Sequence, residues 1–430
     1  MKKSTITCDM EGVIETMNEG AEEIFGYRKE ELIGKKRVSI FSPGEIVLQN
    51  VANWLETAVK KGVYEGETVF INKNKEEINA KIKITPTFKN GRDNPQTGYC
   101  GVTQVIDKEV NVKISNSTKI IKWLAITRMP FTSASILPIL VTAAYFAYIG
   151  DNLFSVPSLV LTVLGILFAH LSINVFNDYF DYVDGTDEEN TKYFQQLSGG
   201  SRAVELGLIS IKNTKKLAIL LCIASLFFGS LVVYNSSSAN IISIFIIAKI
   251  ALFLGYYYTA PPLRFISRRG LGELSIFLTF GPLLTLGTAF AIFQGDLLNS
   301  GHNHLLNCIL LGIPMGLLTT NILLINQFPD SESDARTGKN HLVVTFGKKN
   351  SRWIYLVILL LAVVASIYFA IEIGSYLSIL SSLIILIYGL VVSYKIFKNY
   401  NKRCLVSSNW STIYIHTVFC FSIILFLLIS

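Results

Sequence analysis

Long apolar runs, histidine and paired cysteines are all missing from the first part of this 430-residue chain. The first histidine is His170, and Met1 to Glu23 contain no apolar core of the kind that a secretory signal peptide requires. The six cysteines are scattered and none forms a Cys-x-x-Cys pair. These absences argue against a cleaved signal peptide, a disulfide framework and a zinc site.

Apolar segments dominate the rest of the chain. The sequence is 51% hydrophobic with a mean hydropathy of +0.45, which is too apolar for a soluble enzyme of this length. Runs of about 18 or more apolar residues are typical of transmembrane helices. Nine such segments lie near 132–149, 155–177, 216–234, 240–258, 274–294, 305–326, 354–371, 376–394 and 411–429. We therefore predict a soluble module over 1–115 and an all-α polytopic membrane module of nine transmembrane helices over 118–430.

Basic residues are absent from every second loop. No Lys or Arg occurs near 150–154, 235–239, 295–304 and 372–375, whereas the other loops are basic. By the positive-inside rule, the N-terminus lies in the cytoplasm and the C-terminus outside a cytoplasmic membrane. Up to Lys113 there are 17 basic and 17 acidic residues, and beyond it 21 and 14, so the net charge of +7 belongs to the membrane module. Orientation in the lipid bilayer explains this excess, and no nucleic-acid partner is expected.

The soluble module shows short, mixed patterns. Residues 66–88 alternate well enough for two strands around a turn at 72–75, and 99–110 predict a last strand. Residues 18–34 predict two short helices separated by a turn at Gly26. Together these patterns indicate a small α+β domain.

The segment "DMEGVIETMNEGAEEIFGYRKEELIGK" resembles the opening of a PAS domain, and "GYCGVTQVIDKEV" fits its close. The matching positions are Gly12, Asn18, Ala21, Phe25, Gly26, Tyr27, Glu31, Leu32, Ile33 and Gly34. The resemblance implies a cytoplasmic sensory or dimerisation domain, with a homodimer as one consequence. This domain has no histidine for haem, and Cys8 and Cys100 lie outside the helical region that carries the cysteine of flavin photoreceptors. A ligand-free interaction module is the favoured interpretation.

A first cluster of polar residues ends the second apolar segment, in "NDYFDYVDGTD", 177–187. If the helix continues past Asn177, then Asn174, Asn177, Asp178 and Asp181 share one face. Like charges so placed repel one another, and no Lys or Arg follows until Lys192. Mg²⁺, which prefers oxygen ligands, is the natural compensating cation.

A second cluster, "INQFPDSESDARTGK", begins where the sixth apolar segment ends at Asn326. Asp330 and Asp334 are four residues apart, and Pro329 is expected to open that helical turn. Solvated turns would explain either cluster alone, but the pattern Asn-x-x-x-Asp occurs in both. Two carboxylate clusters with nearby cations suit a diphosphate held through metal ions.

Several other residues are candidates for the same site. The stretch "GGSR" places Arg202 beside two glycines, which let backbone N–H groups approach an anion. In "YYYTAPPLRF", Tyr258 and Arg264 are placed to reach a phosphate or an acceptor, while the preceding tyrosines suit an interfacial belt. Lys249 either enters an internal polar cavity or snorkels, and Arg128 either lines the site or anchors a helix. The histidines show no pairing suited to a metal.

The membrane module resembles the UbiA superfamily of intramembrane prenyltransferases over roughly 118–430. Its two aspartate motifs match "NDYFDYVDGTD" and "NQFPDSESDARTGK", and "RMPFT", "GGSR", "YTAPPLRF" and "GLGE" resemble the branch that prenylates 1,4-dihydroxy-2-naphthoate. The resemblance implies transfer of an isoprenyl group from a polyprenyl diphosphate to an aromatic acceptor in menaquinone biosynthesis. One departure is Gly185, which stands where many members have a third acid, so that Asp184 or, as we favour, Asp187 must serve.

The resemblance also implies roles for individual residues. Mg²⁺ would be held by Asp178, Asp181, Asp187, Asp330 and Asp334. Catalysis would depend on Asp181, Asp330, Asp334 and Asn177. The diphosphate would be met by Arg128, Arg202, Lys249, Arg264, Arg336 and Lys339. The acceptor would be positioned by Asn174, Tyr258 and Asn326.

Alternative acceptors and alternative functions account for part of this pattern. A chlorophyll-type or glycerolipid-type acceptor fits the same motifs. A transporter with a cytoplasmic sensor would place its polar residues near the bilayer midplane, whereas these cluster at one interface. A PAS-controlled receptor would need an output domain, and none follows the ninth apolar segment in this sequence.

Overall fold

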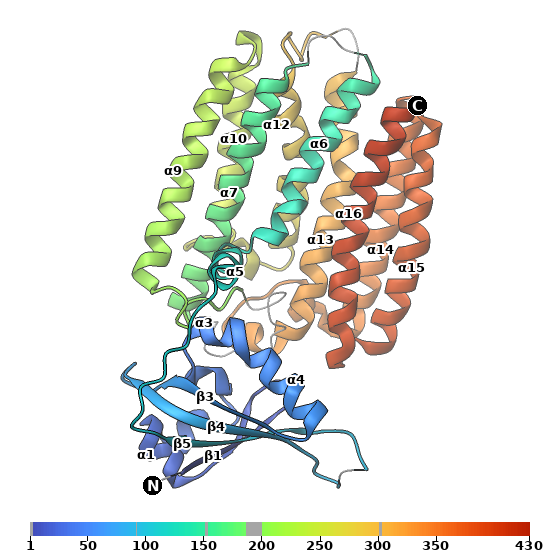
Figure 1. Cartoon of the computed structure of the whole chain (residues 1–430). Coiled ribbons are helices and arrows are strands. Elements are labelled where there is room, and N and C mark those ends of the chain that lie inside the picture. The colour runs from blue at the N-terminus through green and yellow to red at the C-terminus, as the bar shows by residue number, and fades with distance from the viewer. Residues whose placement is uncertain (1–2, 92, 151–153, 186–199, 301–302) are drawn as a thin grey trace. The chain divides into compact units, whose positions relative to one another are not determined.

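The computed structural model describes residues 3–91, 93–150, 154–185, 200–300 and 303–430 (Figure 1). The chain divides into two compact units. Within the described residues, one unit contains the chain up to Ile126 together with Ser201–Asn213, and the other contains the remainder. The short segment 201–213 therefore packs with the N-terminal domain, although it lies between two apolar helices in the sequence.

The N-terminal domain is built on a five-stranded antiparallel sheet in the order β2-β1-β5-β4-β3. Its strands are β1 (Lys3–Asp9), β2 (Ile14–Met17), β3 (Tyr64–Ile71), β4 (Glu77–Thr87) and β5 (Gly98–Val105). Alternation drives this assignment, since Ala80, Ile82 and Ile84 of β4 are buried while the lysines between them are exposed. The predicted hairpin around 72–75 and the predicted last strand are confirmed.

Helices connect β2 to β3 in this domain. They are α1 (Glu19–Phe25), α2 (Lys29–Leu32), η1 (Val38–Phe41), α3 (Gly44–Ile46), η2 (Val47–Val51) and α4 (Ala52–Lys61). Phe25 stacks on Phe41 with 4.2 Å between ring centroids, and this pair closes the core beneath the sheet. The two short helices around Gly26 are confirmed, whereas the helical stretch from α3 to α4 was not predicted.

The second unit is an all-α bundle. Its helices, with α5 (Asn116–Thr127) leading into them, are α6 (Ser133–Tyr148), α7 (Val156–Val183), α9 (Ile211–Asn235), α10 (Ile241–Tyr256), α11 (Leu271–Phe280), α12 (Pro282–Ile292), α13 (His304–Arg336), α14 (Leu342–Glu372), α15 (Ile379–Asn399) and α16 (Val406–Ile429). In the part of the chain that the structure describes, nine stretches are long and apolar enough to cross a membrane, with α11 and α12 forming one of them. The chain is a multi-pass membrane protein of the predicted fold class.

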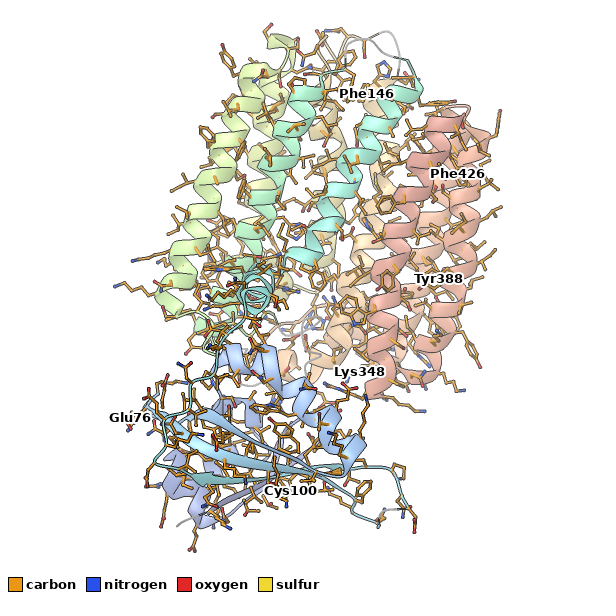
Figure 2. All side chains as sticks on the ribbon, in the orientation of Figure 1. Glu76, Cys100, Phe146, Lys348, Tyr388 and Phe426 are labelled. Atoms are coloured by element: carbon orange, nitrogen blue, oxygen red, sulfur yellow. The ribbon has the colours of Figure 1, made fainter. Side chains whose placement is uncertain are left out.

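The bundle closes on itself. Helix α13 packs on α14, α14 on α15 and α15 on α16. Helix α16 packs in turn against α13 and α6, so that the first and last spanning helices are neighbours (Figure 1). Figure 2 labels Phe146 of α6, which is buried in the core of this bundle, and Phe426 of α16. At the junction of α11 and α12, a Cβ on Gly281 would lie 2.6 Å from the carbonyl oxygen of Gly312. Small residues thus let α11, α12 and α13 approach closely, as is common between membrane helices.

Two helices extend further than their apolar segments indicate. Helix α7 runs to Val183, and α13 runs to Arg336 with Pro329 inside it. The prediction that Pro329 opens a helical turn is wrong. Proline has no N–H for the carbonyl of Ile325, and the side-chain amide of Asn409 donates to that carbonyl instead at 3.3 Å. The freed backbone group is satisfied, so the helix continues and carries the second aspartate cluster.

The N-cap of α1 generates a stability prediction. The Oδ1 atom of Asn18 accepts from the backbone N–H groups of Ala21 and Thr5, and its Nδ2 donates to the carbonyl of Lys3. Asn18→Ala should lower the free energy of unfolding of this domain by about 2 kcal/mol. Urea-dependent proteolysis of the N-terminal domain measures this, with Asn74→Ala in the exposed turn as the control. Equal urea midpoints for both variants would contradict the assignment.

Candidate functional site

The first cluster lies on the last turns of α7, so the predicted helical continuation past Asn177 is confirmed. Asp178 is buried with 6% of its surface exposed. Neighbouring segments hold the two amides: Asn174 donates to the carbonyl of Thr127 at 3.1 Å, and Asn177 accepts from the hydroxyl of Thr259 at 2.7 Å. These hydrogen bonds orient one polar face of α7.

The second cluster lies on the last turns of α13. Asp330 and Asp334 are both buried. The Oδ2 atom of Asp334 is 3.0 Å from Nε2 of His341, which is itself buried. One turn before Asp330, the Oδ1 atom of Asn326 accepts from Asn409 of α16 at 2.7 Å. The end of α13 that carries these acids is therefore contacted by His341 after it in the chain and by Asn409 of α16.

An ion pair joins the two clusters. The Nζ atom of Lys339 lies 2.6 Å from Oδ1 of Asp181, and Lys339 is 6% exposed. The backbone N–H of Lys339 donates to the carbonyl of Asp334 at 2.8 Å, which turns the chain back toward α7. Two motifs far apart in the sequence thus form one site, and part of the compensating charge that α7 needs comes from the second motif.

The segment after α10 contributes Tyr258, which is buried beside both clusters. Burial and the carboxylates of Glu273, Asp181 and Asp334 raise the pKa of Tyr258 well above its ordinary value, while Arg128 opposes this effect. The charges that act on this hydroxyl come from the first cluster, the second cluster and α11. The phenol stays protonated at neutral pH and can donate a hydrogen bond.

The end of α7 contains Asp184 and Gly185, the two residues at the position of the third acid of the first motif. Asp184 caps the helix and pairs with Nη2 of Arg264 at 2.9 Å. Gly185 follows with a φ of +74°, which ends the helix at the position where an acid was expected. Asp187 lies outside the described residues, so its role as a metal ligand stays a prediction.

The backbone at Gly200 approaches the first cluster closely. A Cβ on Gly200 would lie 2.7 Å from Oδ1 of Asp178, and its φ is +73°. Only glycine fits there without a shift. The next residues, Ser201 and Arg202, belong to the other compact unit, in which the Arg202 side chain is buried and lies 3.1 Å from Oε2 of Glu205.

Three other predicted cations differ in their positions. The guanidinium of Arg128 lies 5.0 Å from the ring centroid of Phe131 and acts on Tyr258. Arg336 is the exposed last residue of α13. Lys249 is exposed on α10, a helix with no buried residue, so the structure does not bring it to the clusters. Its position agrees with the snorkelling alternative, and a contact with the diphosphate stays a prediction.

The sequence did not predict that three side chains support the site, those of Glu273, Gln327 and His341. Glu273 of α11 accepts hydrogen bonds from Gln327 and from the backbone of Leu342, and His341 contacts Asp334. A charged residue at the start of an apolar segment was the signal for Glu273. His341 was read as structural because its sequence neighbours gave no metal-binding pattern.

The donor chemistry of the clusters fits a divalent cation that is shared with a phosphate ligand. Among the described residues, no group of three or more His, Cys, Asp or Glu side chains is arranged to hold a metal ion by itself. Mg²⁺ commonly binds through one or two carboxylates and completes its coordination with phosphate oxygens and water. Carboxylates on α7 and on α13, with Lys339 and Arg264 beside them, match that requirement.

Two family models match the chain. The UbiA prenyltransferase family matches residues 135–423, and a PAS domain matches residues 2–103. These matches agree with the resemblances inferred from the sequence motifs, and the N-terminal unit contains a PAS domain.

Individual relatives agree with these matches. The 1,4-dihydroxy-2-naphthoate octaprenyltransferase of Haemophilus influenzae is 30% identical over 244 residues, which cover 56% of this chain and 73% of that protein. The 2-carboxy-1,4-naphthoquinone phytyltransferase of Synechocystis is 29% identical over 53% of this chain and 66% of that protein. The apo structure of a UbiA homolog from Aeropyrum pernix K1 has a TM-score of 0.52 at 15% identity, and the match covers 69% of this chain and 98% of that chain. The likeness to that structure shows the fold.

The junction of the two clusters generates a cross-linking prediction. In a variant whose six cysteines are replaced, Asp181→Cys combined with Lys339→Cys should be joined by a short bismaleimide, because Asp181 and Lys339 are in direct contact. Proteolysis between the two positions followed by gel electrophoresis detects the joined fragments. The single variants and the pair Lys249→Cys with Lys339→Cys are the controls. Separate fragments from the Asp181–Lys339 pair, with both thiols reactive, would contradict the geometry.

Proposed function

The chain belongs to the UbiA prenyltransferase family, and on that basis we propose that it transfers an isoprenyl group from a polyprenyl diphosphate to 1,4-dihydroxy-2-naphthoate in menaquinone biosynthesis. The naphthoate and naphthoquinone prenylating relatives support this acceptor class. The observation that carries the proposal is the ion pair between Lys339 and Asp181, which unites two acidic clusters into one site. Chlorophyll-type and glycerolipid-type acceptors are the alternatives that the same assay distinguishes.

The acids and the cations of the site have different roles in binding a diphosphate. We assign the metal-ligand role to Asp178, Asp181, Asp330 and Asp334, with Asp187 as a further ligand. Mg²⁺, when bound there, would neutralise charge on the diphosphate and so ease its departure. Arg264, Arg336 and Lys339 supply positive charge for the phosphate oxygens, since charge-assisted hydrogen bonds to phosphate are strong.

The uncharged polar groups orient the two substrates. The hydroxyl of Tyr258 donates a hydrogen bond to a phosphate or acceptor oxygen. Asn174, Asn177 and Asn326 are fixed by their partners and present the remaining polar surface. The apolar helices around them exclude water, which would otherwise hydrolyse the activated prenyl donor.

The protein is proposed to lie in the cytoplasmic membrane with its N-terminus and the site on the cytoplasmic side. The alternation of basic and uncharged loops supports this orientation. Both clusters lie on helix ends that lead into basic loops, as a site for a water-soluble diphosphate head group requires.

We further propose that the PAS domain regulates transfer through residues 201–213. A Cβ on Gly44 of α3 would lie 2.3 Å from the carbonyl oxygen of Leu206, so this segment packs directly on α3. The same helical stretch contacts the chain that leads into the bundle, through Glu45 with Lys122 at 2.8 Å. Because the backbone of Gly200 is close to the carboxylate of Asp178, a shift of 201–213 would move Gly200 and change the position of that carboxylate. Dimerisation through the PAS domain stays a prediction.

Transfer activity should depend on both clusters. Membranes that contain the protein, incubated with labelled prenyl diphosphate, Mg²⁺ and dihydroxynaphthoate, should form a lipid-soluble product. Asp181→Ala or Asp330→Ala should lower the rate by about 100-fold or more. The control is Asp296→Asn, a partly exposed acid whose carboxylate accepts hydrogen bonds from the loop that follows it. Wild-type rates in both cluster variants, or no product with any acceptor, would overturn the proposal.

The proposed regulation is tested at α3. Gly44→Ala forces residues 201–213 away from α3, and we expect a change in transfer rate of about 3-fold with an unchanged level of folded protein. Gly101→Ala in β5 is the matched control, because the nearest atom to its added Cβ is 3.9 Å away. Identical rates for the two variants would show that the packing of this segment does not influence the site.

A further inference from the structure

Glu273 is an acid that is buried near the start of the apolar helix α11. It is the third residue of α11, and only 3% of its surface is exposed. Burial of a carboxylate is costly unless hydrogen bonds compensate it. Its Oε1 atom accepts two: from Nε2 of Gln327 at 2.9 Å and from the backbone N–H of Leu342 at 3.0 Å. Its Oε2 atom has no hydrogen-bond partner among the described residues.

The first of these hydrogen bonds leads to Asp330. Gln327 lies three residues before Asp330 on α13, so the two side chains are about one helical turn apart on the same side of the helix. The amide of Gln327 is 4% exposed, and its bond to Glu273 ties α13 to α11 at that level. Rotation or fraying of the end of α13 would therefore break this bond.

The second hydrogen bond leads to Asp334. Leu342 is the first residue of α14 and follows His341, whose Nε2 lies 3.0 Å from Oδ2 of Asp334. The backbone N–H of Leu342 is anchored on Glu273, and so the imidazole beside it is placed against the acid. One carboxylate oxygen thus fixes the chain on both sides of the second cluster.

Glu273 is also close enough to the site to act on Tyr258, where it is the largest of the charges that raise the pKa of that hydroxyl. The hydrogen-bonded oxygen of Glu273 contacts Gln327 and the backbone of Leu342, neither of which is a proposed ligand of the metal or the diphosphate. Its place is therefore beside the site, in contact with the elements that carry the ligands.

We propose that Glu273 is a positioning residue for the second aspartate cluster, and that it sets the affinity of that cluster for Mg²⁺ and diphosphate by fixing α13 and α14 relative to each other. This inference rests on the proposed function of the cluster. Groups that orient metal ligands without touching the metal typically change its affinity by about 10-fold or more.

The test uses the full chain in lipid nanodiscs, with Mg²⁺ and inorganic diphosphate as the probe. A ligand that binds only the folded protein raises its Tm, so Tm as a function of probe concentration gives the half-saturating concentration without any turnover. Glu273→Ala should raise that concentration by about 10-fold. Glu273→Gln keeps an acceptor oxygen for Gln327 and Leu342 and should stay within about 2-fold of the wild type.

Matched variants separate positioning from general packing. Gln327→Ala should raise the half-saturating concentration in the same direction as Glu273→Ala. The double variant should be no worse than Glu273→Ala alone, because Glu273→Ala has already removed the contact with Gln327. Ser275→Ala, which removes a buried hydroxyl that bonds only within α11, should leave the half-saturating concentration unchanged. Asn321→Ala removes a buried amide that ties α13 to α14 through the carbonyl of Tyr355, away from the acids, and should also leave it unchanged.

The outcomes distinguish the positioning role of Glu273 from the proposed function of the second aspartate cluster. A wild-type half-saturating concentration in Glu273→Ala, or an equal rise in Ser275→Ala and Asn321→Ala, would overturn the positioning role. If Glu273→Ala does not fold, Gln327→Ala decides in the same way. A wild-type protein whose Tm does not respond to Mg²⁺ and diphosphate would overturn the proposed function of the cluster, and the inference with it.

Discussion

The contact between Lys339 and Asp181 is the interaction on which the site depends. Several acids crowd the ends of α7 and α13, and they would repel one another without a cation between them. Lys339 is buried, so its charge acts at close range and with little screening. A buried pair of this kind is costly to desolvate and contributes little to net stability, which indicates that it serves the site more than the fold.

Helix α13 extends to the contact with α7 because hydrogen bonds from neighbouring helices pair the polar groups near its end. Helix α13 continues past Pro329 because Asn409 of α16 takes up the carbonyl of Ile325. The same Asn409 amide holds Asn326, while Glu273 ties α13 and the start of α14 to α11. Three different helices therefore stabilise the short stretch that carries Asp330 and Asp334. This arrangement explains how so many polar groups persist at the end of an otherwise apolar bundle.

The sequence predicts what is periodic or repeated and misses what depends on contacts between distant segments. Apolar length located the spanning helices, alternation located β3 and β4, and the repeated Asn-x-x-x-Asp pattern located both clusters. Helix length past Pro329 could not be predicted, because the compensating donor lies about 80 residues further along the chain. The pairing of His341 with Asp334 had no local pattern, since it depends on the turn that Lys339 makes. The exposed position of Lys249 could not be predicted, because hydropathy does not tell which face of α10 turns outward.

The central claim is that the two clusters act together on one metal–diphosphate complex. Electron paramagnetic resonance of Mn²⁺, used in place of Mg²⁺, tests it most directly by measuring bound metal with and without inorganic diphosphate. The account predicts that tight Mn²⁺ binding requires diphosphate and is lost when either Asp178 or Asp334 alone is changed to Asn. Mn²⁺ that binds equally well after the loss of one cluster, or without diphosphate, would contradict it.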